Sequence, residues 1–453
     1  MGARMHAWSD DLDAFADAAM AFARARIEAD ASPHGLPLGT PRDVAWLDAH
    51  AGPTITADGI GPLRALDIFT DVLEPSCLSI DHHGFLAFVP QAPNEVSVIA
   101  DLVVSACSIY AGSWLEGSGA VWAENQVLSW LADLAGFPDG AGGCFVQGGT
   151  NGNLSAMVAA REEMHRRLRT RPDRWTVVTG RGAHASVTEM ARVMDCDVVS
   201  IDGDRLTGDA VAAALADLPG RVACVVATCG STNLGRIDRL DEVADACEAA
   251  GVWLHVDGAY GGAGLLAPSV RDRYRGIERA DSFIVDPHKW LFAPFDACAL
   301  LYRDPVCGAR AHTQHGGYLE VLTSSGEWNP SDYGVQLSRR ARGLPLWFGL
   351  AAHGTDAYVR AIEHTLDLAR DAARQILAAD HLELIEEPEL SVVAFRRLGW
   401  GEQDYQRWSR RLLADDIAFV VASKHEGEPI LRFGFINPRT TPQHVAQILG
   451  TLA

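Results

Sequence analysis

An aspartate and a lysine each follow an apolar segment of the sequence, and together they could do chemistry. Asp257 comes after the apolar residues 252–256, and His288 and Lys289 come after residues 282–285. Continuous apolar runs of this length predict strands buried on both faces, as in a parallel sheet covered by helices. Ligands of open α/β sheets bind at the carboxyl ends of the strands. We therefore expect a buried carboxylate and a buried amine to meet at one site.

Such a pair is what an enzyme that uses pyridoxal phosphate requires. The amine of Lys289 would form an imine with the aldehyde of the cofactor. The carboxylate of Asp257 would keep the pyridine nitrogen protonated, so that the ring can accept electrons. A structural ion pair at the ends of two core strands is the alternative interpretation for an isolated aspartate and lysine. The residues around the pair favour the cofactor.

These residues carry a resemblance to a known family. The segments H-V-D-x-A-Y, which contains Asp257, and P-H-K-W, which contains Lys289, resemble the pyridoxal-dependent decarboxylases that include the aromatic-L-amino-acid and glutamate decarboxylases (group II, fold type I). The resemblance implies an α/β protein with the fold type I of pyridoxal-phosphate-dependent transferases. It also implies a homodimer with active sites at the subunit interface. We expect an N-terminal helical and extended segment at 1–75, a large cofactor domain at 76–345 with a mixed, mostly parallel sheet, and a small α+β domain at 346–453.

A Gly-rich turn is the expected phosphate site. The segment C-F-V-Q-G-G-T-N-G-N-L joins a predicted strand to a predicted helix. Amides at a helix N-terminus, with glycines that let a ligand approach the backbone, bind anions. In the resembling family this turn holds the cofactor phosphate, and Gly149, Thr150 and Asn151 occupy the matching positions. No G-x-G-x-x-G pattern is present, which disfavours a dinucleotide-binding turn.

Four further residues match cofactor contacts of the family. His184 begins a predicted helix and resembles the histidine that stacks on the pyridine ring. Thr228 ends a predicted strand and matches a threonine near the ring hydroxyl, although a β-branched residue is also common there for packing reasons. Ala259 and His288 complete the expected set.

Asp286 is a departure from the family. Aromatic decarboxylases carry at this position, just before the proline, an asparagine that reaches the phosphate. A carboxylate beside a dianionic phosphate is repelled unless it is turned away or bonded to backbone amides. We assign Asp286 no cofactor contact from the sequence.

Three aromatic residues match the substrate side of the family's cleft. Phe88, Trp114 and Phe295 occupy positions where the family places aromatic side chains. An aromatic residue taken alone is more often a core residue than a pocket residue. Together they favour an aromatic L-amino acid, which would yield the amine and carbon dioxide once it has displaced Lys289 from the cofactor. The sequence presents no arginine that we can tie to a distal carboxylate, which disfavours a glutamate-type substrate.

Residues 311–335 are rich in Gly, Ser and His and predict a long loop, and long loops over clefts often act as lids. In the aromatic decarboxylases a loop tyrosine from the neighbouring subunit protonates the α-carbon. Tyr333 follows Asp332 as that tyrosine follows an aspartate, but it lies closer to the following arginines than in the family. His315 and Tyr318 are the other candidate proton donors.

Other functions stay open at this stage. Without a loop proton donor, the same scaffold could act as an aldehyde synthase that couples decarboxylation to oxidative deamination. An acidic-amino-acid decarboxylase is a second alternative. A pyridoxal-binding protein without catalysis is disfavoured, because a degenerate site has no chemical reason to keep Asp257, His184 and Lys289 together.

The composition indicates which binding partners and which cellular compartment to expect. A formal net charge of −21 argues against nucleic acid, whose phosphates favour basic surfaces. Nine cysteines without a C-x-x-C pair are typical of reduced thiols, and no metal site is visible. We expect neither a signal peptide nor a membrane span, and hence a cytoplasmic protein. Residues 10–30 predict an amphipathic helix, whereas residues 32–62 predict turns and extended chain.

Overall fold

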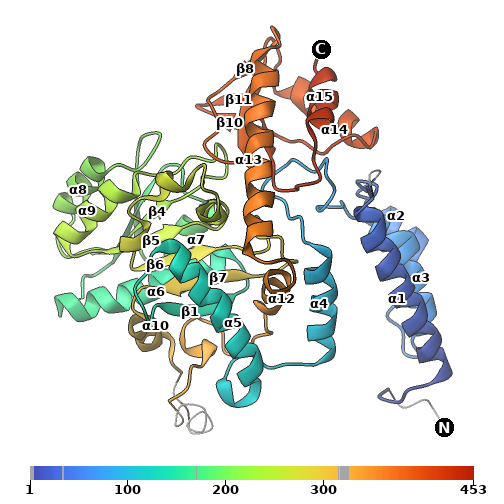
Figure 1. Cartoon of the computed structure of the whole chain (residues 1–453), viewed down its shortest axis with the longest axis horizontal. Coiled ribbons are helices and arrows are strands. Elements are labelled where there is room, and N and C mark those ends of the chain that lie inside the picture. The colour runs from blue at the N-terminus through green and yellow to red at the C-terminus, as the bar shows by residue number, and fades with distance from the viewer. Residues whose placement is uncertain (1–4, 33–34, 170, 315, 317–325) are drawn as a thin grey trace.

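The computed structural model of the protein describes residues 5–32, 35–169, 171–314, 316 and 326–453. Figure 1 shows three groups of elements: N-terminal helices at one side, a central sheet covered by helices, and C-terminal elements above them. No helix in the described part of the chain combines the length and the apolar character needed to cross a membrane.

The central sheet is mixed and mostly parallel. In the described part of the chain, seven strands pair in the order β1-β7-β6-β5-β4-β2-β3, and β7 is antiparallel to both of its neighbours. The strands are β1 (Gly142–Val146), β2 (Thr176–Gly180), β3 (Asp197–Ile201), β4 (Val222–Thr228), β5 (Trp253–Asp257), β6 (Ser282–Val285) and β7 (Cys298–Tyr302). This α/β architecture confirms the fold class predicted from the sequence.

The three central strands bring their carboxyl ends to one edge. Every residue of β4, β5 and β6 is buried, as the continuous apolar runs predict. The parallel register places Thr228 of β4 beside Asp257 of β5, and Asp257 beside Ile284 of β6. The segment that carries Lys289 leaves β6 at this same edge.

Helices cover both faces of the central sheet. The core cluster on one face includes residues of α6 (Gly149–Leu168), α7 (Ala185–Val193) and α10 (Pro305–His312). The cluster on the other face includes residues of α5 (Trp114–Ala135), α8 (Gly208–Asp217) and α9 (Leu240–Ala250). The α6 side chains against the sheet are small and fully buried, among them Ala156, Ala159 and Ala160, so the helix packs close to the strands.

The N-terminal helices bury little of their apolar surface within the chain. The predicted helix is α1 (Asp10–Asp30), and none of its residues is buried. The expectation of only turns and extended chain at 32–62 was wrong, because α2 (Val44–Ala51) forms there. Asp43 caps it by accepting a hydrogen bond at Oδ1 from the Trp46 amide at 2.8 Å. Next along the chain are α3 (Pro62–Ile68) and α4 (Glu95–Ala106).

The C-terminal elements form a second sheet with its own core. Helices α12 (Leu344–His353) and α13 (Thr355–Leu377) lead into antiparallel strands in the order β10-β11-β9-β8. Phe395, Phe433 and Phe435 pack in the core of this unit. Its remaining elements are β8 (Leu382–Leu384), β9 (Val392–Arg397), β10 (Ala422–His425), β11 (Glu428–Gly434), α14 (Glu402–Ala414) and α15 (Pro442–Gly450).

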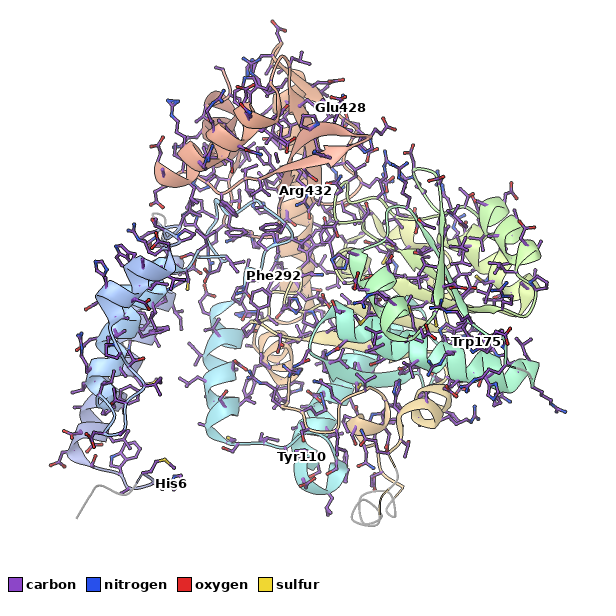
Figure 2. The ribbon with its side chains drawn as sticks, turned by 180° about the vertical axis from the view of Figure 1, so that it is seen from behind. His6, Tyr110, Trp175, Phe292, Glu428 and Arg432 are labelled. Atoms are coloured by element: carbon purple, nitrogen blue, oxygen red, sulfur yellow. The ribbon has the colours of Figure 1, made fainter. Side chains whose placement is uncertain are left out.

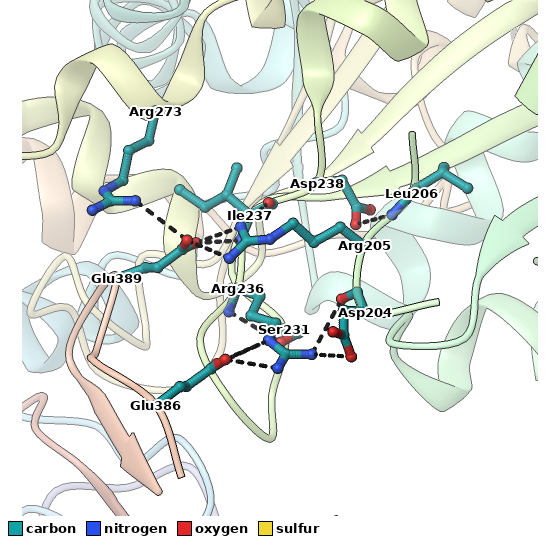
Figure 3. A network of polar contacts seen from close by, with 10 residues as sticks. All are labelled: Asp204, Arg205, Leu206, Ser231, Arg236, Ile237, Asp238, Arg273, Glu386 and Glu389. Atoms are coloured by element: carbon teal, nitrogen blue, oxygen red, sulfur yellow. Dashed lines mark hydrogen bonds and ion pairs between the residues drawn. The ribbon is translucent and has the colours of Figure 1, made fainter. Parts of the chain in front are cut away.

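Ion pairs tie the segment between β8 and β9 to the central unit (Figure 3). Glu389 accepts hydrogen bonds from Arg205, and Arg236 binds both Glu386, at 2.6 Å, and Asp204, at 2.9 Å. Burial raises the pKa of Glu389, but hydrogen bonds from Arg205 and the Ile237 amide, together with the charges of Arg205 and Arg273, outweigh burial and leave the pKa below its usual range. This network fixes the turn after β4, which borders the site described next.

All nine cysteines are free thiols. Cys77 and Cys107 are exposed, and the others are buried. Burial raises the pKa of Cys144 to about 12, so its thiol stays protonated and unreactive at neutral pH.

Candidate active site

A cavity of about 220 Å³ lies at the edge where β4, β5 and β6 end. Its walls come from the Gly-rich turn, the start of α7, the strand ends and the segment after β6. It is lined by Gly148, Gly149, Thr150, Asn153, His184, Ser186, Thr228, Gly230, Thr232, Asp257, Ala259, Tyr260, Asp286, His288 and Lys289. A wider cavity of about 480 Å³ shares His184 and Thr232 with it and extends toward Lys424 of β10.

Asp257 is buried and held by two hydrogen bonds. Its Oδ1 accepts from the Ala259 amide at 3.0 Å, and its Oδ2 accepts from Asn153 Nδ2 at 2.9 Å. A carboxylate oxygen can accept more than one hydrogen bond, so the side chain can still receive a further donor from the cavity. Asp257 is therefore a fixed negative charge on the cavity wall.

A chain of buried hydrogen bonds stands behind Asp257. Asn153 donates to Asp257, so its Oδ1 faces His255 Nε2 at 2.9 Å and accepts from it. His255 Nδ1 then accepts from Ser282 Oγ at 2.8 Å, and Ser282 accepts from Trp253 Nε1 at 2.9 Å. Burial lowers the pKa of His255 to about 4, so the ring is neutral near pH 7. Every donor in this series of hydrogen bonds thus has one acceptor, and the Asp257 carboxylate is held in a single orientation.

Asn153 also orients His184. It donates to Ser186 Oγ at 3.0 Å, which leaves the Ser186 hydroxyl to donate to His184 Nδ1 at 2.8 Å. His184 is the N-cap of α7, and its Nδ1 accepts from the Ser186 amide as well. With Nδ1 as the acceptor, the neutral ring carries its proton on Nε2.

The Gly-rich turn forms the start of α6. Gly148 is the N-cap and Gly149 is the first helical residue, so the first amides of α6 lack partners within the helix. A Cβ at Gly149 would lie 3.0 Å from the Cβ of Ala259 and 3.1 Å from Asp286 Oδ2. The missing side chain keeps the turn open, and the helix start is suited to an anion.

Lys289 meets a carboxylate in the cavity. Its Nζ lies 2.9 Å from Oδ2 of Asp286, which is itself 2% exposed. Burial lowers the pKa of Lys289, but the charge of Asp286 and its hydrogen bond outweigh burial and leave the pKa above the ordinary value.

His288 lies beside this pair. Its Nδ1 donates to the Ala297 carbonyl at 2.7 Å, and its Nε2 is 3.7 Å from Asp286 Oδ2. Burial lowers the pKa of His288, so its ring is neutral near pH 7.

Comparison with known proteins assigns this arrangement to a family. The sequence model described as "Pyridoxal-dependent decarboxylase conserved domain" matches residues 62–398. The chain belongs to the pyridoxal-dependent decarboxylase family. It is therefore a lyase that uses pyridoxal phosphate, which confirms the family, cofactor and enzyme class predicted from the sequence.

Two curated relatives are similar over most of their length. The chain is 31% identical over 414 residues to an aromatic-L-amino-acid decarboxylase of Bacillus atrophaeus, which covers 87% of this chain and 86% of that protein. It is 32% identical over 392 residues to an L-2,4-diaminobutyrate decarboxylase of Rhizobium meliloti, which covers 82% of this chain and 78% of that protein.

Solved structures share the fold. A structure of Oryza sativa TDC with PLP and tryptamine has a TM-score of 0.91 at 23% identity and covers 99% of both chains. Rhodiola rosea 4-hydroxyphenylacetaldehyde synthase has a TM-score of 0.87 at 19% identity and covers 98% of this chain and 97% of its own.

The residues of the cavity fit the cofactor of the family. Two buried polar atoms on its wall, Thr228 Oγ1 and Asp286 Oδ1, have no hydrogen-bond partner within the chain. Buried polar atoms normally have partners, so these two mark places where a polar ligand completes the wall. An anion site at the Gly-rich turn, an amine at Lys289 and a carboxylate at Asp257 match the phosphate, aldehyde and pyridine nitrogen of pyridoxal phosphate.

The cavity contains most of the cofactor residues proposed from the sequence. Gly149, Thr150, His184, Thr228, Asp257, Ala259, His288 and Lys289 all line it. Asn151 does not, since its side chain donates to Gln147 Oε1 at 2.7 Å. The Asn153 amide, two residues further along α6, reaches the cavity instead.

The proposed substrate residues lie outside this cavity within one chain. Phe295 comes nearest, with its ring 5.0 Å from that of His288. Phe88 is more than half exposed, and Trp114 begins α5 with its amide bonded to Asn329. Tyr333 stacks on Trp328 with the ring centroids 4.1 Å apart, and it does not line the cavity. The other two candidate proton donors, His315 and Tyr318, lie outside the described residues.

Sequence reasoning missed several residues around the site. Asn153, Ser186 and His255 belong to this series of hydrogen bonds, and the only available signal was the polar residue His255 within the apolar run 252–256. Arg432 of β11 was also missed. It is 4% exposed, it donates to the Phe88 carbonyl at 2.6 Å, and its Nε and Nη2 have no hydrogen-bond partner. Figure 2 shows Glu428 at the far end of the C-terminal sheet and Arg432 nearer to the central unit.

Proposed function

We propose that this enzyme decarboxylates an aromatic L-amino acid to the corresponding amine and carbon dioxide. The observation that carries the proposal is Phe295, a residue that is 48% exposed and whose ring lies 5.0 Å from the ring of His288, a residue of the cavity wall. A flat apolar side chain would cover this ring and gain stacking contacts. The name of the Bacillus atrophaeus relative supports the same substrate class.

Catalysis divides between the cofactor and the chain. Bound pyridoxal phosphate supplies a ring that accepts the electrons left on the α-carbon when the carboxylate leaves. Asp257, held by Asn153 and the Ala259 amide, provides the negative charge that keeps the ring nitrogen protonated. Lys289 provides the amine that holds the aldehyde carbon until the substrate amine replaces it.

The rest of the cavity orients and encloses the reactants. The first amides of α6 would bind the phosphate, while the Thr228 hydroxyl would bind a polar group of the ring. His184 would cover the ring face and direct its Nε2 proton toward the substrate carboxylate. Enclosure of this kind excludes water and fixes the bond that breaks.

We propose that the enzyme is a homodimer whose active sites lie at the subunit interface. Exposed apolar side chains on α1, α4 and the segment after α3 support a subunit interface there. They include Met20, Phe69, Ile99, Leu102 and Val103. Leu102→Glu would then yield monomers in sedimentation equilibrium, whereas Leu377→Glu, at an exposed leucine on α13, would leave the dimer intact. A wild-type protein that sediments as a monomer would contradict the proposal.

The proposed proton donor also depends on a second subunit. Tyr333 does not line the cavity of its own chain, so it would act on the partner's site. Burial raises the pKa of Tyr333 to about 12, which keeps its hydroxyl protonated and able to donate near pH 7. The proposed domains are 1–75, 76–345 and 346–453, with the first packing on the partner. Free, buried cysteines support a cytoplasmic location.

A substrate panel tests the function. We expect release of carbon dioxide from L-tryptophan, L-tyrosine or L-phenylalanine at least tenfold faster than from L-glutamate or L-2,4-diaminobutyrate, because only the aromatic side chains can stack on Phe295. Lys289→Ala should abolish turnover. Preference for diaminobutyrate or glutamate would overturn the aromatic proposal and leave the decarboxylase class intact.

An aldehyde product is the second candidate. It requires that Tyr333, which lies outside the cavity of its own chain, also fails to reach the site of the partner subunit, because an unprotonated α-carbon would be open to oxygen. Hydrogen peroxide and ammonia, formed in step with carbon dioxide, would identify this reaction. Amine without peroxide would exclude it.

A further inference from the structure

We propose that Asp286 holds Lys289 as an ammonium ion in the cofactor-free enzyme and accepts its proton when pyridoxal phosphate binds, so that a neutral carboxyl group faces the phosphate. The inference rests on the proposed role of Lys289 and concerns loading of the cofactor. It does not depend on which amino acid is the substrate.

The first observation is the buried ion pair itself. Lys289 Nζ lies 2.9 Å from Asp286 Oδ2, and the Asp286 side chain is almost fully buried. Its second oxygen, Oδ1, has no hydrogen-bond partner in the chain. A buried carboxylate oxygen without a donor is costly, so the carboxylate is stabilised chiefly by Lys289.

The second observation is that Asp286 faces the expected phosphate site. A Cβ at Gly149 would lie 3.1 Å from Asp286 Oδ2 and 3.4 Å from Oδ1. Gly149 is the first residue of α6, where the free amides attract an anion. The carboxylate and the phosphate would therefore carry like charges toward the same helix start.

No other cation among the described residues at this pair can offset two negative charges. His288 approaches Asp286 Oδ2 at 3.7 Å, but burial lowers the pKa of its imidazole and keeps it neutral. The other titratable groups that act on the pair are Asp257, which adds negative charge, and the protonated thiol of Cys298. Once Lys289 is bonded to the aldehyde carbon, Asp286 has lost its partner charge.

Transfer of one proton resolves the conflict. The ammonium group of Lys289 gives its proton to Asp286 Oδ2, and the neutral amine then attacks the aldehyde carbon. A carbon–nitrogen double bond forms, the aldehyde oxygen leaves as water, and no proton is taken from solvent. The Asp286 carboxyl group, now neutral, can donate a hydrogen bond to a phosphate oxygen, as the family's asparagine does with its amide.

Cofactor affinity as a function of pH tests the proposal. We would titrate the cofactor-free enzyme with pyridoxal phosphate above about pH 7, where the phosphate itself stays a dianion, and follow tryptophan fluorescence. The proposed transfer neither takes a proton from solvent nor releases one, so the wild-type dissociation constant should stay constant with pH while Asp286 keeps the proton. In Asp286→Asn the proton of Lys289 has no acceptor in the site and must leave to solvent, so the dissociation constant should fall by up to about tenfold for each pH unit while Lys289 is an ammonium ion. Asp217→Asn, the same change at an exposed position of α8, should follow the wild type.

Pyridoxal, which lacks the phosphate, tests whether the phosphate is what makes Asp286 keep the proton of Lys289. With pyridoxal the dissociation constant of the wild type should fall with rising pH as that of Asp286→Asn does, because no second negative charge reaches Gly149 and Asp286 has no reason to keep the proton. Parallel pH curves for the wild type and Asp286→Asn with pyridoxal phosphate would overturn the proposal, and so would a wild-type curve that is flat with pyridoxal. If Asp286→Asn does not fold, the wild type alone decides, since identical pH slopes for the two ligands would refute it.

Discussion

At the scale of single residues, the proposed site depends on side chains that hold other side chains in place. Asp257 and His184 would perform the chemistry proposed for them only in one orientation, and Asn153 bonds to Asp257 directly and to His184 through Ser186. His255, Ser282 and Trp253 in turn hold Asn153. A positioning residue of this kind should affect catalysis more than stability.

Asn153→Leu tests this chain of hydrogen bonds. Because the variant keeps the branched shape of the side chain but removes both donors, we expect kcat to fall about 10- to 100-fold and the visible absorbance of the bound cofactor to shift as Asp257 loses its orientation. Asn151→Leu is the matched control on the same helix, since Asn151 bonds only to Gln147. Equal effects of the two variants on kcat and absorbance would show that Asn153 has no positioning role.

Thr228 offers a second comparison between matched residues. Its hydroxyl is buried without a partner, whereas the Thr179 hydroxyl donates to the Val226 carbonyl at 3.0 Å. Thr228→Val should therefore leave the cofactor-free enzyme as stable as the wild type but weaken cofactor binding. Thr179→Val should lower stability by about 1 kcal/mol and leave binding unchanged. Thermal unfolding measures the stability, and cofactor titration measures the binding. Weaker cofactor binding by Thr179→Val but not by Thr228→Val would contradict the proposed role of Thr228.

At the scale of elements, the ends of β4, β5 and β6 and the start of α6 create the cavity. Thr228, Asp257 and Lys289 could be predicted because each follows a local apolar run, and runs of this kind identify strands without knowledge of the fold. The hydrogen-bond chain could not, because Asn153, His255 and Ser282 meet only after distant segments pack. The capping residue Asp43 was the local signal for α2, and it was not recognised within a segment rich in Pro and Gly.

The ion pairs around Glu389 join two such elements. Glu389→Gln should destabilise the enzyme by about 2 kcal/mol at pH 7, because Arg205 loses its charged partner. Glu387→Gln, at an exposed neighbour, should have no effect. The lowered pKa of Glu389 stabilises the folded state above the pKa of the unfolded chain, and this contribution is lost as the pH falls through the folded value. Urea unfolding at pH 7 and in acid measures the free energy of unfolding of the variants and the wild type. An unchanged free energy of unfolding for Glu389→Gln at pH 7 would contradict a stabilising role of the network.

At the scale of the whole molecule, the proposed site is complete only in a dimer. Coexpression of Tyr333→Phe with Lys289→Ala tests this directly, since each parent dimer should be inactive or nearly so. If Lys289 and Tyr333 of one site come from different chains, a heterodimer contains one intact site, and the mixture should recover about a quarter of wild-type activity. No recovery, in a mixture shown to contain heterodimers, would mean that Tyr333 does not act across the interface.

The central claim is that Lys289 holds the cofactor. Chemical labelling tests it directly, because Lys289 and Lys424 are the only lysines in the sequence. Borohydride reduction of the enzyme loaded with pyridoxal phosphate, followed by peptide mass mapping, would show which amine holds the cofactor. We predict that the peptide containing Lys289 gains the mass of the reduced cofactor and that the peptide containing Lys424 does not. Labelling at Lys424 alone, or no labelling of either lysine, would contradict the account.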